Sequence, residues 1–219
     1  MPIDVRYESW LRPGVASQMR NLVAQELANG DQGHPPYRYF VMAMEYVIRH
    51  IDFRARHTML DAGCGVGHYA HIVHRYWPHI NYHGFDFSKH MVEKALAWSP
   101  NKGFKFFVAD AKEFDYSGYD IVLASSLIEV MDEWAEGAQA ICETARGFVI
   151  LHRVRTHHAL TVREEHEGYE GQPTYAWVHE PMELVNFFED RGLDLQWWTS
   201  WDEFRDRPFN MTTYIFRKL

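Results

Sequence analysis

Short apolar runs alternate with longer amphipathic segments from His57 to beyond the middle of the chain. The runs are "TMLDAG", "INYHGFD", "FKFFVAD", "YDIVLAS" and "GFVILHR", and each has the length of a buried strand. Between them lie segments long enough for helices, at residues 68–77, 89–97 and 132–145. Strands and helices that alternate in this way predict a parallel sheet covered by helices on both faces.

The two ends of the chain carry different patterns. Residues 1–55 predict helices interrupted by the turn-forming stretch "NGDQGHPPY", so we expect a helical cap ahead of one compact domain at residues 56–219. Near the carboxyl end, a helix is expected between Pro181 and Gly192. The apolar stretches "LDLQWWTSW" and "MTTYIFRKL" follow it, and their short connection predicts an antiparallel hairpin.

Composition and charge narrow the class of protein. The chain has 219 residues, of which 47% are hydrophobic, as in an ordinary globular domain. Its net charge of −8 argues against binding nucleic acid through a broad basic face. The chain has only two cysteines, its amino terminus lacks the apolar core of a signal peptide, and its apolar runs are too short to span a bilayer. We therefore expect a cytoplasmic protein without a membrane partner. The oligomeric state is left open.

Three glycines spaced two residues apart follow the first buried strand, in "MLDAGCGVGHY" at residues 59–69. Glycines in such a loop allow a sharp turn and let a ligand approach the backbone closely. The dinucleotide fingerprint G-x-G-x-x-G would need a glycine at position 68, which is His68 here. Asp61 precedes the loop, and a carboxylate is unfavourable beside the pyrophosphate of a dinucleotide.

The loop and three later segments resemble, in order, the motifs of class I S-adenosylmethionine (SAM)-dependent methyltransferases. "LDAGCGVG" resembles their first motif. In "YHGFDFSKHMVEKA", Asp86 matches the acidic residue that binds the ribose hydroxyls, and in "FVADAKEF", Asp110 matches the acid that accepts from the adenine amino group. "YDIVLASSLIEV" resembles the fourth strand and the loop that faces the transferred methyl group. The resemblance implies a doubly wound, mostly parallel seven-stranded sheet with an antiparallel last strand.

The same resemblance implies SAM as cofactor and S-adenosyl-L-homocysteine (SAH) as product. SAM carries a sulfonium cation, an ammonium group, two ribose hydroxyls and an aromatic amine, so a pocket with several carboxylates complements it. The residues implied to bind it lie at or after strand ends: Asp61, Gly63, Cys64, Gly65, Gly67, Asp86, Phe87, Met91, Asp110, Ala111 and Ser125.

Methyl transfer to an O, N or C atom of a small molecule is the expected activity, because no module for recognising a macromolecule is appended. Glu129 and His152 follow the fourth and fifth strands, where the acceptor should lie, and they are candidate general bases. Each also has an explanation as a polar residue at the end of an element. No metal site is expected, because the histidines do not match a known zinc spacing.

The acceptor side is expected to involve the cap. Ligand sites in open α/β sheets lie outside the carboxyl ends of the strands, and a cap over that edge would exclude water. The candidate acceptor contacts are Tyr7, Trp10, Tyr37 and Arg153.

Two alternatives fit the same motifs. One is another SAM-fold transferase or an NAD-type Rossmann-like enzyme, which tight binding of NAD or of decarboxylated SAM would favour. The other is a non-catalytic SAM-fold subunit, which would bind SAM without turnover until a partner protein is added.

Overall fold

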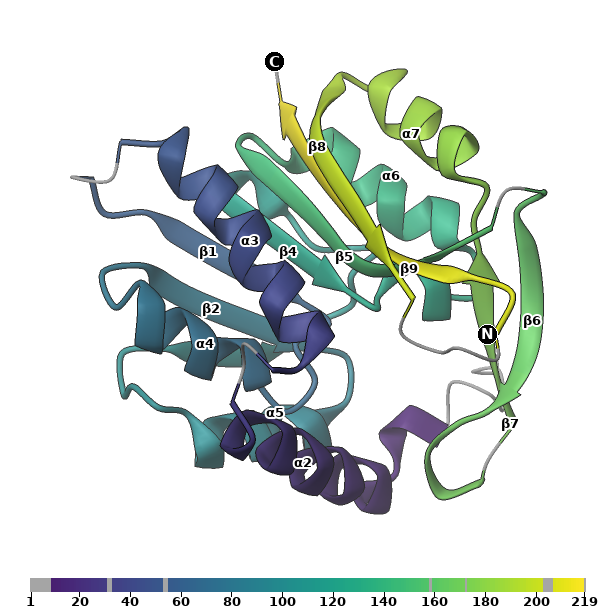
Figure 1. The fold of residues 1–219 in the computed structure, drawn as a ribbon. Coiled ribbons are helices and arrows are strands. Elements are labelled where there is room, and N and C mark those ends of the chain that lie inside the picture. Colours follow the sequence, from purple (N-terminus) through teal and green to yellow (C-terminus); the bar gives the residue numbers. More distant parts are fainter. Residues whose placement is uncertain are drawn as a thin grey trace.

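The computed structural model describes residues 9–30, 33–52, 55–157, 159–171, 173–202 and 207–218. Its centre is a seven-stranded sheet of order β3-β2-β1-β4-β5-β9-β8 (Figure 1). Neighbouring strands from β3 to β5 are parallel, whereas β9 is antiparallel to both of its neighbours. The predicted sheet is confirmed, including its antiparallel last strand. The strands are β1 (Thr58–Ala62), β2 (Asn81–Asp86), β3 (Lys105–Val108), β4 (Ile121–Ser125), β5 (Phe148–Thr156), β8 (Leu193–Trp201) and β9 (Asn210–Lys218).

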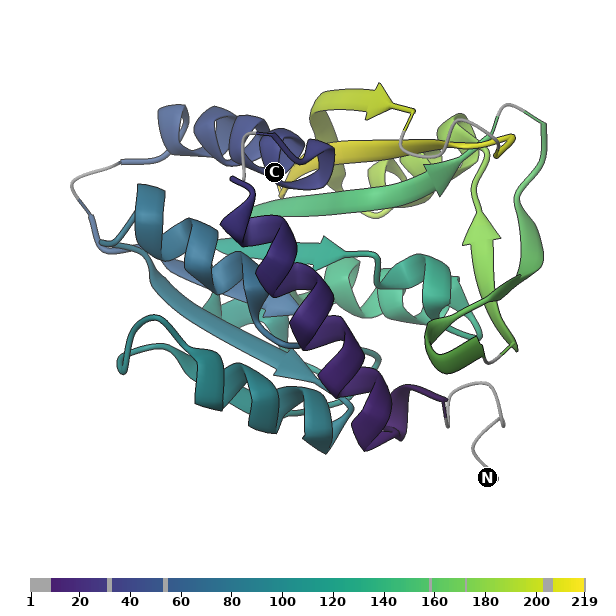
Figure 2. The same cartoon turned by 60° about the horizontal axis from the view of Figure 1, so that its bottom comes forward.

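Helices cover both faces of this sheet, as Figures 1 and 2 show. One face packs against α3 (Pro35–Arg49), α4 (His68–Tyr76) and α5 (Lys89–Trp98). The other face packs against α6 (Trp134–Thr144) and α7 (Pro181–Glu189). The central strands are buried almost without interruption because both of their faces are covered.

The helix α3 belongs to the core although it precedes the first strand. Two prolines at its start preset the helical backbone without removing a needed donor. Its buried side chains recur at helical spacing and form one apolar stripe: Tyr37, Phe40, Val41, Met44 and Val47. Part of the segment expected as a cap, residues 1–55, therefore packs directly on the sheet.

Two elements lie outside the layers, at the carboxyl edge of the sheet. The helix α2 (Pro13–Ala28) packs over the glycine loop and α5 through Val15, Ala16 and Val23. The strands β6 (Val162–Glu167) and β7 (Pro173–Val178) form a separate antiparallel hairpin, which the sequence did not predict. A hydrogen bond of 3.1 Å from the Glu170 amide to Gln18 Oε1 joins the hairpin to α2.

Short 3-10 turns complete the described chain: η1 (Ser9–Leu11), η2 (Tyr116–Gly118), η3 (Ile128–Val130) and η4 (Tyr169–Gly171). No helix in the described ranges is long and apolar enough to cross a bilayer. The strand order reverses between β1 and β4. At such a reversal the loops after neighbouring strands diverge, and a crevice opens at the carboxyl ends of the strands.

Candidate active site

A cavity of about 980 Å³ lies at this crevice, between the sheet edge, α2 and the β6–β7 hairpin. The loops that follow β1, β2, β3 and β4 line one end, and residues of β5, the hairpin and the segment before β9 line the other. Small-molecule sites typically have volumes of about 300–1,000 Å³, so this cavity has room for more than one compact ligand.

The glycine loop forms part of the cavity wall. Gly63 and Gly65 line the cavity with φ angles of +70° and +53°, in the left-handed region that favours glycine. A Cβ atom at Gly65 would lie 3.0 Å from Met19 Sδ of α2. The Cys64 amide donates to the Phe85 carbonyl at 2.8 Å and so ties the loop to β2. The backbone is therefore bare toward the cavity and anchored beneath it.

Cys64 and Gly67 lie on the protein side of this loop. The Cys64 side chain is buried, and a Cβ atom at Gly84 of β2 would lie 3.0 Å from its Sγ. Gly67 caps the start of α4 at a φ of +78°, where a Cβ atom would meet Ala95 and Phe106 at 3.1 Å. Both residues shape the loop from below.

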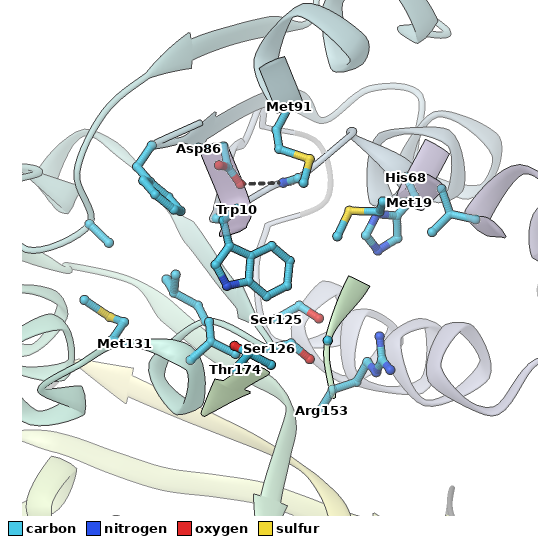
Figure 3. A pocket seen from close by; sticks show the side chains of 18 of the residues that line it. Trp10, Met19, His68, Asp86, Met91, Ser125, Ser126, Met131, Arg153 and Thr174 are labelled. Atoms are coloured by element: carbon cyan, nitrogen blue, oxygen red, sulfur yellow. Dashed lines mark hydrogen bonds between the residues drawn. The ribbon is translucent and has the colours of Figure 1, made fainter. Parts of the chain in front are cut away.

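Asp86 ends β2 and faces the cavity as a buried carboxylate. Its Oδ2 accepts from the Gly65 amide at 3.0 Å (dashed line in Figure 3), and its Oδ1 accepts from the Ser88 amide at 2.8 Å. Burial raises the pKa of Asp86 to about 6 despite these two hydrogen bonds. The carboxylate fixes the loop and keeps further lone pairs for a ligand that donates hydrogen bonds.

Asp61 lies behind the cavity wall instead of in it. Its Oδ2 accepts a hydrogen bond from the Tyr82 hydroxyl, and its Oδ1 is buried without a partner among the described residues. Burial raises the pKa of this carboxyl to about 7.

The remaining predicted cofactor residues line the same end of the cavity. Asp110 is exposed there, and its Oδ1 accepts from the Lys112 amide at 2.9 Å. With it on the wall are Phe87, Met91, Ala111 and Ser125. Carboxylates, a bare backbone and apolar side chains thus meet in one place. That combination of groups fits SAM, with its cationic sulfur, hydroxyls and flat adenine ring.

The acceptor contacts predicted from the sequence come together in part. Trp10, Tyr37 and Arg153 line the cavity, and Figure 3 shows the Trp10 indole in the middle of the lining side chains. Tyr7 lies outside the described residues. The Tyr37 hydroxyl donates to Glu26 Oε2 at 2.7 Å. Burial alone would raise the pKa of Glu26, but hydrogen bonds from His34 and Tyr37 and the charge of Arg153 bring it to about 2.

The two candidate bases are buried, and neither is among the described residues that line the cavity. Burial raises the pKa of Glu129 to about 7, and its neighbour along the turn, Ser126, does line the cavity. His152 packs among the rings of Phe40, Tyr69 and Trp201, and its Nδ1 lies 2.7 Å from Thr213 Oγ1. Burial lowers the pKa of His152 well below its usual value, so the ring is neutral.

The backbone departs from regular strand geometry where β5 reaches the cavity. Arg153 has a φ of +58°, and the pairing of β5 with β9 shifts between Leu151 and Val154. Such a bulge turns side chains away from their regular alternation. Ser126, in the loop that follows the neighbouring strand β4, has a φ of +48° and also lines the cavity. A residue other than glycine in the left-handed backbone region costs about 1–3 kcal/mol of conformational strain, and such strained residues cluster at functional sites.

Sequence patterns did not indicate several lining residues. Met19 and Glu26 of α2 lie far from the glycine loop in sequence, and only the packing of α2 brings them to it. His68 starts α4 directly after the glycines, and burial lowers its pKa to about 3. The hairpin adds Glu164, His166 and Thr174. Of these, only His68 carried a sequence signal, its position at the start of the helix after the loop.

Comparisons with known proteins agree with this architecture. A family model described as a methyltransferase domain matches residues 54–203. A SAM-dependent methyltransferase from Methanosarcina mazei superposes with a TM-score of 0.62 at 15% identity, over 80% of this chain and 97% of that one. Magnesium protoporphyrin IX methyltransferase from Synechocystis PCC 6803, with bound SAM, gives 0.62 at 16% identity, over 91% and 85%. A chain of the Haloferax volcanii complex between the Trm112 methyltransferase activator and a methyltransferase gives 0.61 at 17%, over 92% and 96%.

At these identities the solved structures establish the fold, and the family model, which spans more than half of the chain, establishes the family. The chain is therefore a member of the methyltransferase-domain family, and its fold is that of SAM-dependent methyltransferases of known structure.

Proposed function

We propose that this methyltransferase transfers the methyl group of SAM to an O, N or C atom of a small molecule held in the same cavity. The observation that carries the proposal is the extent of the cavity. It continues from the glycine loop and Asp86 past Ser125 to Arg153 and the β6–β7 hairpin. One end fits the cofactor, and the other leaves a covered space for a compact acceptor.

At the cofactor end, we assign Asp86 to the ribose hydroxyls and Asp110 to the adenine amino group. Asp86 supports this role by its burial and by its hold on the Gly65 amide, which couples the ribose contact to the shape of the loop. We assign Gly63 and Gly65 to close backbone contact, and Phe87, Met91, Ala111 and Ser125 to the walls. Asp61, Cys64 and Gly67 act from beneath by holding the loop in shape.

We propose that the part of residues 1–55 that precedes α3 serves as the cap over the domain at 56–219. Its contact with the hairpin, from Gln18 to Glu170, closes the cavity from two sides. Exclusion of water strengthens electrostatic interactions inside the site and prevents hydrolysis side reactions. Trp10 and Tyr37 would then contact the acceptor, with Tyr37 held in place by its hydrogen bond to Glu26.

Methyl transfer requires an acceptor lone pair in line with the bond between sulfur and the methyl carbon, so the chain's main task is alignment. Where the acceptor must also lose a proton, Glu129 is the better placed of the two candidate bases. Its pKa of about 7 suits a general base, and it lies beside Ser126 of the cavity wall. His152 has a depressed pKa and aromatic surroundings, which suit a role in packing.

The experiment that tests the proposal is a labelling screen. The purified protein is incubated with SAM carrying a tritiated methyl group and with a cell lysate divided by dialysis into small molecules and retained macromolecules. We expect a new labelled compound, resolved from SAM by chromatography, in the small-molecule fraction, and no such compound with the Gly65→Val variant. Label that enters only the protein or nucleic-acid fraction would contradict a small-molecule acceptor.

A further inference from the structure

Cations gather at the end of the cavity that is farthest along the chain from the glycine loop. Arg155 of β5 and Arg207, which precedes β9, both line it, together with His166 of the hairpin. The whole chain carries a charge of −8, and the cofactor end presents Asp86 and Asp110. The arginines among the described lining residues all lie at this end, beside Glu164 and Glu167, whereas the cofactor end holds the two aspartates and Lys112.

Arg155 is half-buried, and no carboxylate of the described residues forms an ion pair with it, although the charges of Glu129 and Glu164 act on it. Its Nη2 lies 3.2 Å from His166 Nε2 and its Nη1 lies 3.5 Å from His166 Nδ1. Its guanidinium carbon also lies 5.2 Å from the ring centre of Phe209. It forms no ion pair within the described part of the chain, whereas Arg163 on the same hairpin pairs with Asp132 at 2.6 Å. A guanidinium removed from water calls for an anion, because an unpaired buried charge is costly.

The imidazole beside Arg155 is neutral. Burial, followed by the charges of Arg155 and Arg207, lowers the pKa of His166 to about 4. His166 therefore holds the Arg155 guanidinium in place without cancelling its positive charge, and it adds no further charge to the site. The Thr174 hydroxyl, on a buried residue of the same wall, is a further donor.

The acids around this group have other partners or reduced charge. Burial raises the pKa of Glu129 to about 7, so much of its charge is lost near neutral pH. Glu26 is engaged by Tyr37 and His34, and Asp132 by Arg163. Glu164 and Glu167 of β6 also line the cavity, but neither forms an ion pair with Arg155 in the described chain.

We propose that Arg155, Arg207 and His166 form a binding site for an anionic group of the acceptor, a carboxylate or a phosphate. The proposal rests on the proposed function, since it names the class of small molecule that receives the methyl group. Arg155 presents a planar fork that matches either anion with two hydrogen bonds. The apolar remainder of the acceptor would lie against Trp10 and Phe209, which line the same cavity. The anion fixes the acceptor's position while another of its atoms faces the cofactor.

The test uses benzoate, phenyl phosphate and the uncharged benzamide as probes of matched shape. Their affinities are measured by titration calorimetry on the full chain, with and without saturating SAH. We expect one of the two anions to bind at least about tenfold more tightly than benzamide, and the tighter anion identifies carboxylate or phosphate. Arg155→Gln, and separately Arg207→Gln, should lose about tenfold or more of that affinity.

Arg217→Gln is the matched control, because Arg217 is exposed on β9 opposite Phe148, at the other end of β5. It removes the same charge and should bind the anion as the unmodified protein does. Equal binding of benzamide, an unchanged affinity in Arg155→Gln and Arg207→Gln, or an equal loss in Arg217→Gln would each overturn the proposal. Since Arg207 is exposed, its variant remains informative if Arg155→Gln does not fold. Failure of SAH to bind would instead contradict the cofactor assignment, and the probes without SAH still test the anion site.

Discussion

Replacing Asp86 with alanine is the most informative single change at the cofactor end. The carboxylate accepts from the buried amides of Gly65 at 3.0 Å and Ser88 at 2.8 Å. Each amide left without an acceptor costs about 1–3 kcal/mol. The variant also gains stability, because it no longer buries a charged carboxylate. Folding raises the pKa of Asp86 from 3.8 to about 6, which destabilises the native protein by about 3 kcal/mol at about pH 8. The two effects largely offset each other, so Asp86→Ala should fold.

Its affinity for SAM should fall much further than its stability. A hydrogen bond to a charged acceptor contributes about 1.5–3 kcal/mol, so loss of the ribose acceptor should weaken SAM by about 10- to 150-fold. Titration calorimetry at about pH 8 measures this, and circular dichroism checks the fold. Asp115→Ala is the charge-matched control, since Asp115 is exposed and accepts from the Ser117 amide in a turn outside the cavity. Affinity within about twofold of the unmodified protein in a folded Asp86→Ala variant would refute the ribose assignment.

The same carboxyl predicts a dependence on pH. With a pKa of about 6 in the cofactor-free protein, Asp86 must release a proton before it accepts hydrogen bonds with full charge. The affinity for SAM should therefore be constant above this pH and should decrease below it, by up to about tenfold per pH unit. Asp86→Ala should lack this decrease.

Three further predictions concern the loop, the core and the proton acceptor. Gly65→Val should abolish SAM binding in calorimetry, because Gly65 has a φ of +53° and the added Cβ would lie 3.0 Å from Met19 Sδ. Gly118→Val is the control and should bind SAM normally, since the space around Gly118 is open. Equal binding by the two variants would contradict the loop assignment. His179 is fully buried with a pKa lowered to about 3 by burial, so the unfolded chain takes up a proton below about pH 6.5 that the native state refuses. In urea titrations, the free energy of unfolding of His179→Phe should rise relative to that of the unmodified protein by up to about 1.4 kcal/mol per pH unit as the pH falls from 6.5. A difference in this free energy that does not change with pH would refute the prediction. Once the acceptor is identified, the initial rate of methyl transfer should fall as the pH drops through about 7. Glu129→Gln should lower this rate by about 10²-fold or more and should remove its pH dependence. An unchanged pH profile in the variant would exclude Glu129 as the base.

The sheet and the glycine loop could be predicted because their signals are local. A strand buried on both faces requires a continuous apolar run, as in "IVLA" and "FVIL", and each run forms a strand at its expected place. The turn after β1 requires glycine at positive φ, so its residues are visible in the sequence itself.

The cover of the cavity could not be predicted, because it depends on contacts between distant segments. The strand β6 reads "VREEHE", which has too few apolar residues to indicate a strand, and it is stabilised by pairing with β7 at the cavity. The bulge before Val154 likewise has no sequence signature. Because of it, Val154 instead of Arg153 shares the core face of Leu151, and Arg153 lines the cavity.

A crystal structure of the full chain with SAH tests the central assignment most directly. We predict that both ribose hydroxyls lie within hydrogen-bonding distance of the Asp86 carboxylate, the adenine amino group beside Asp110, and the sulfur toward Ser125 and the covered half of the cavity. An adenosine bound elsewhere, or a ribose without contact to Asp86, would contradict the account.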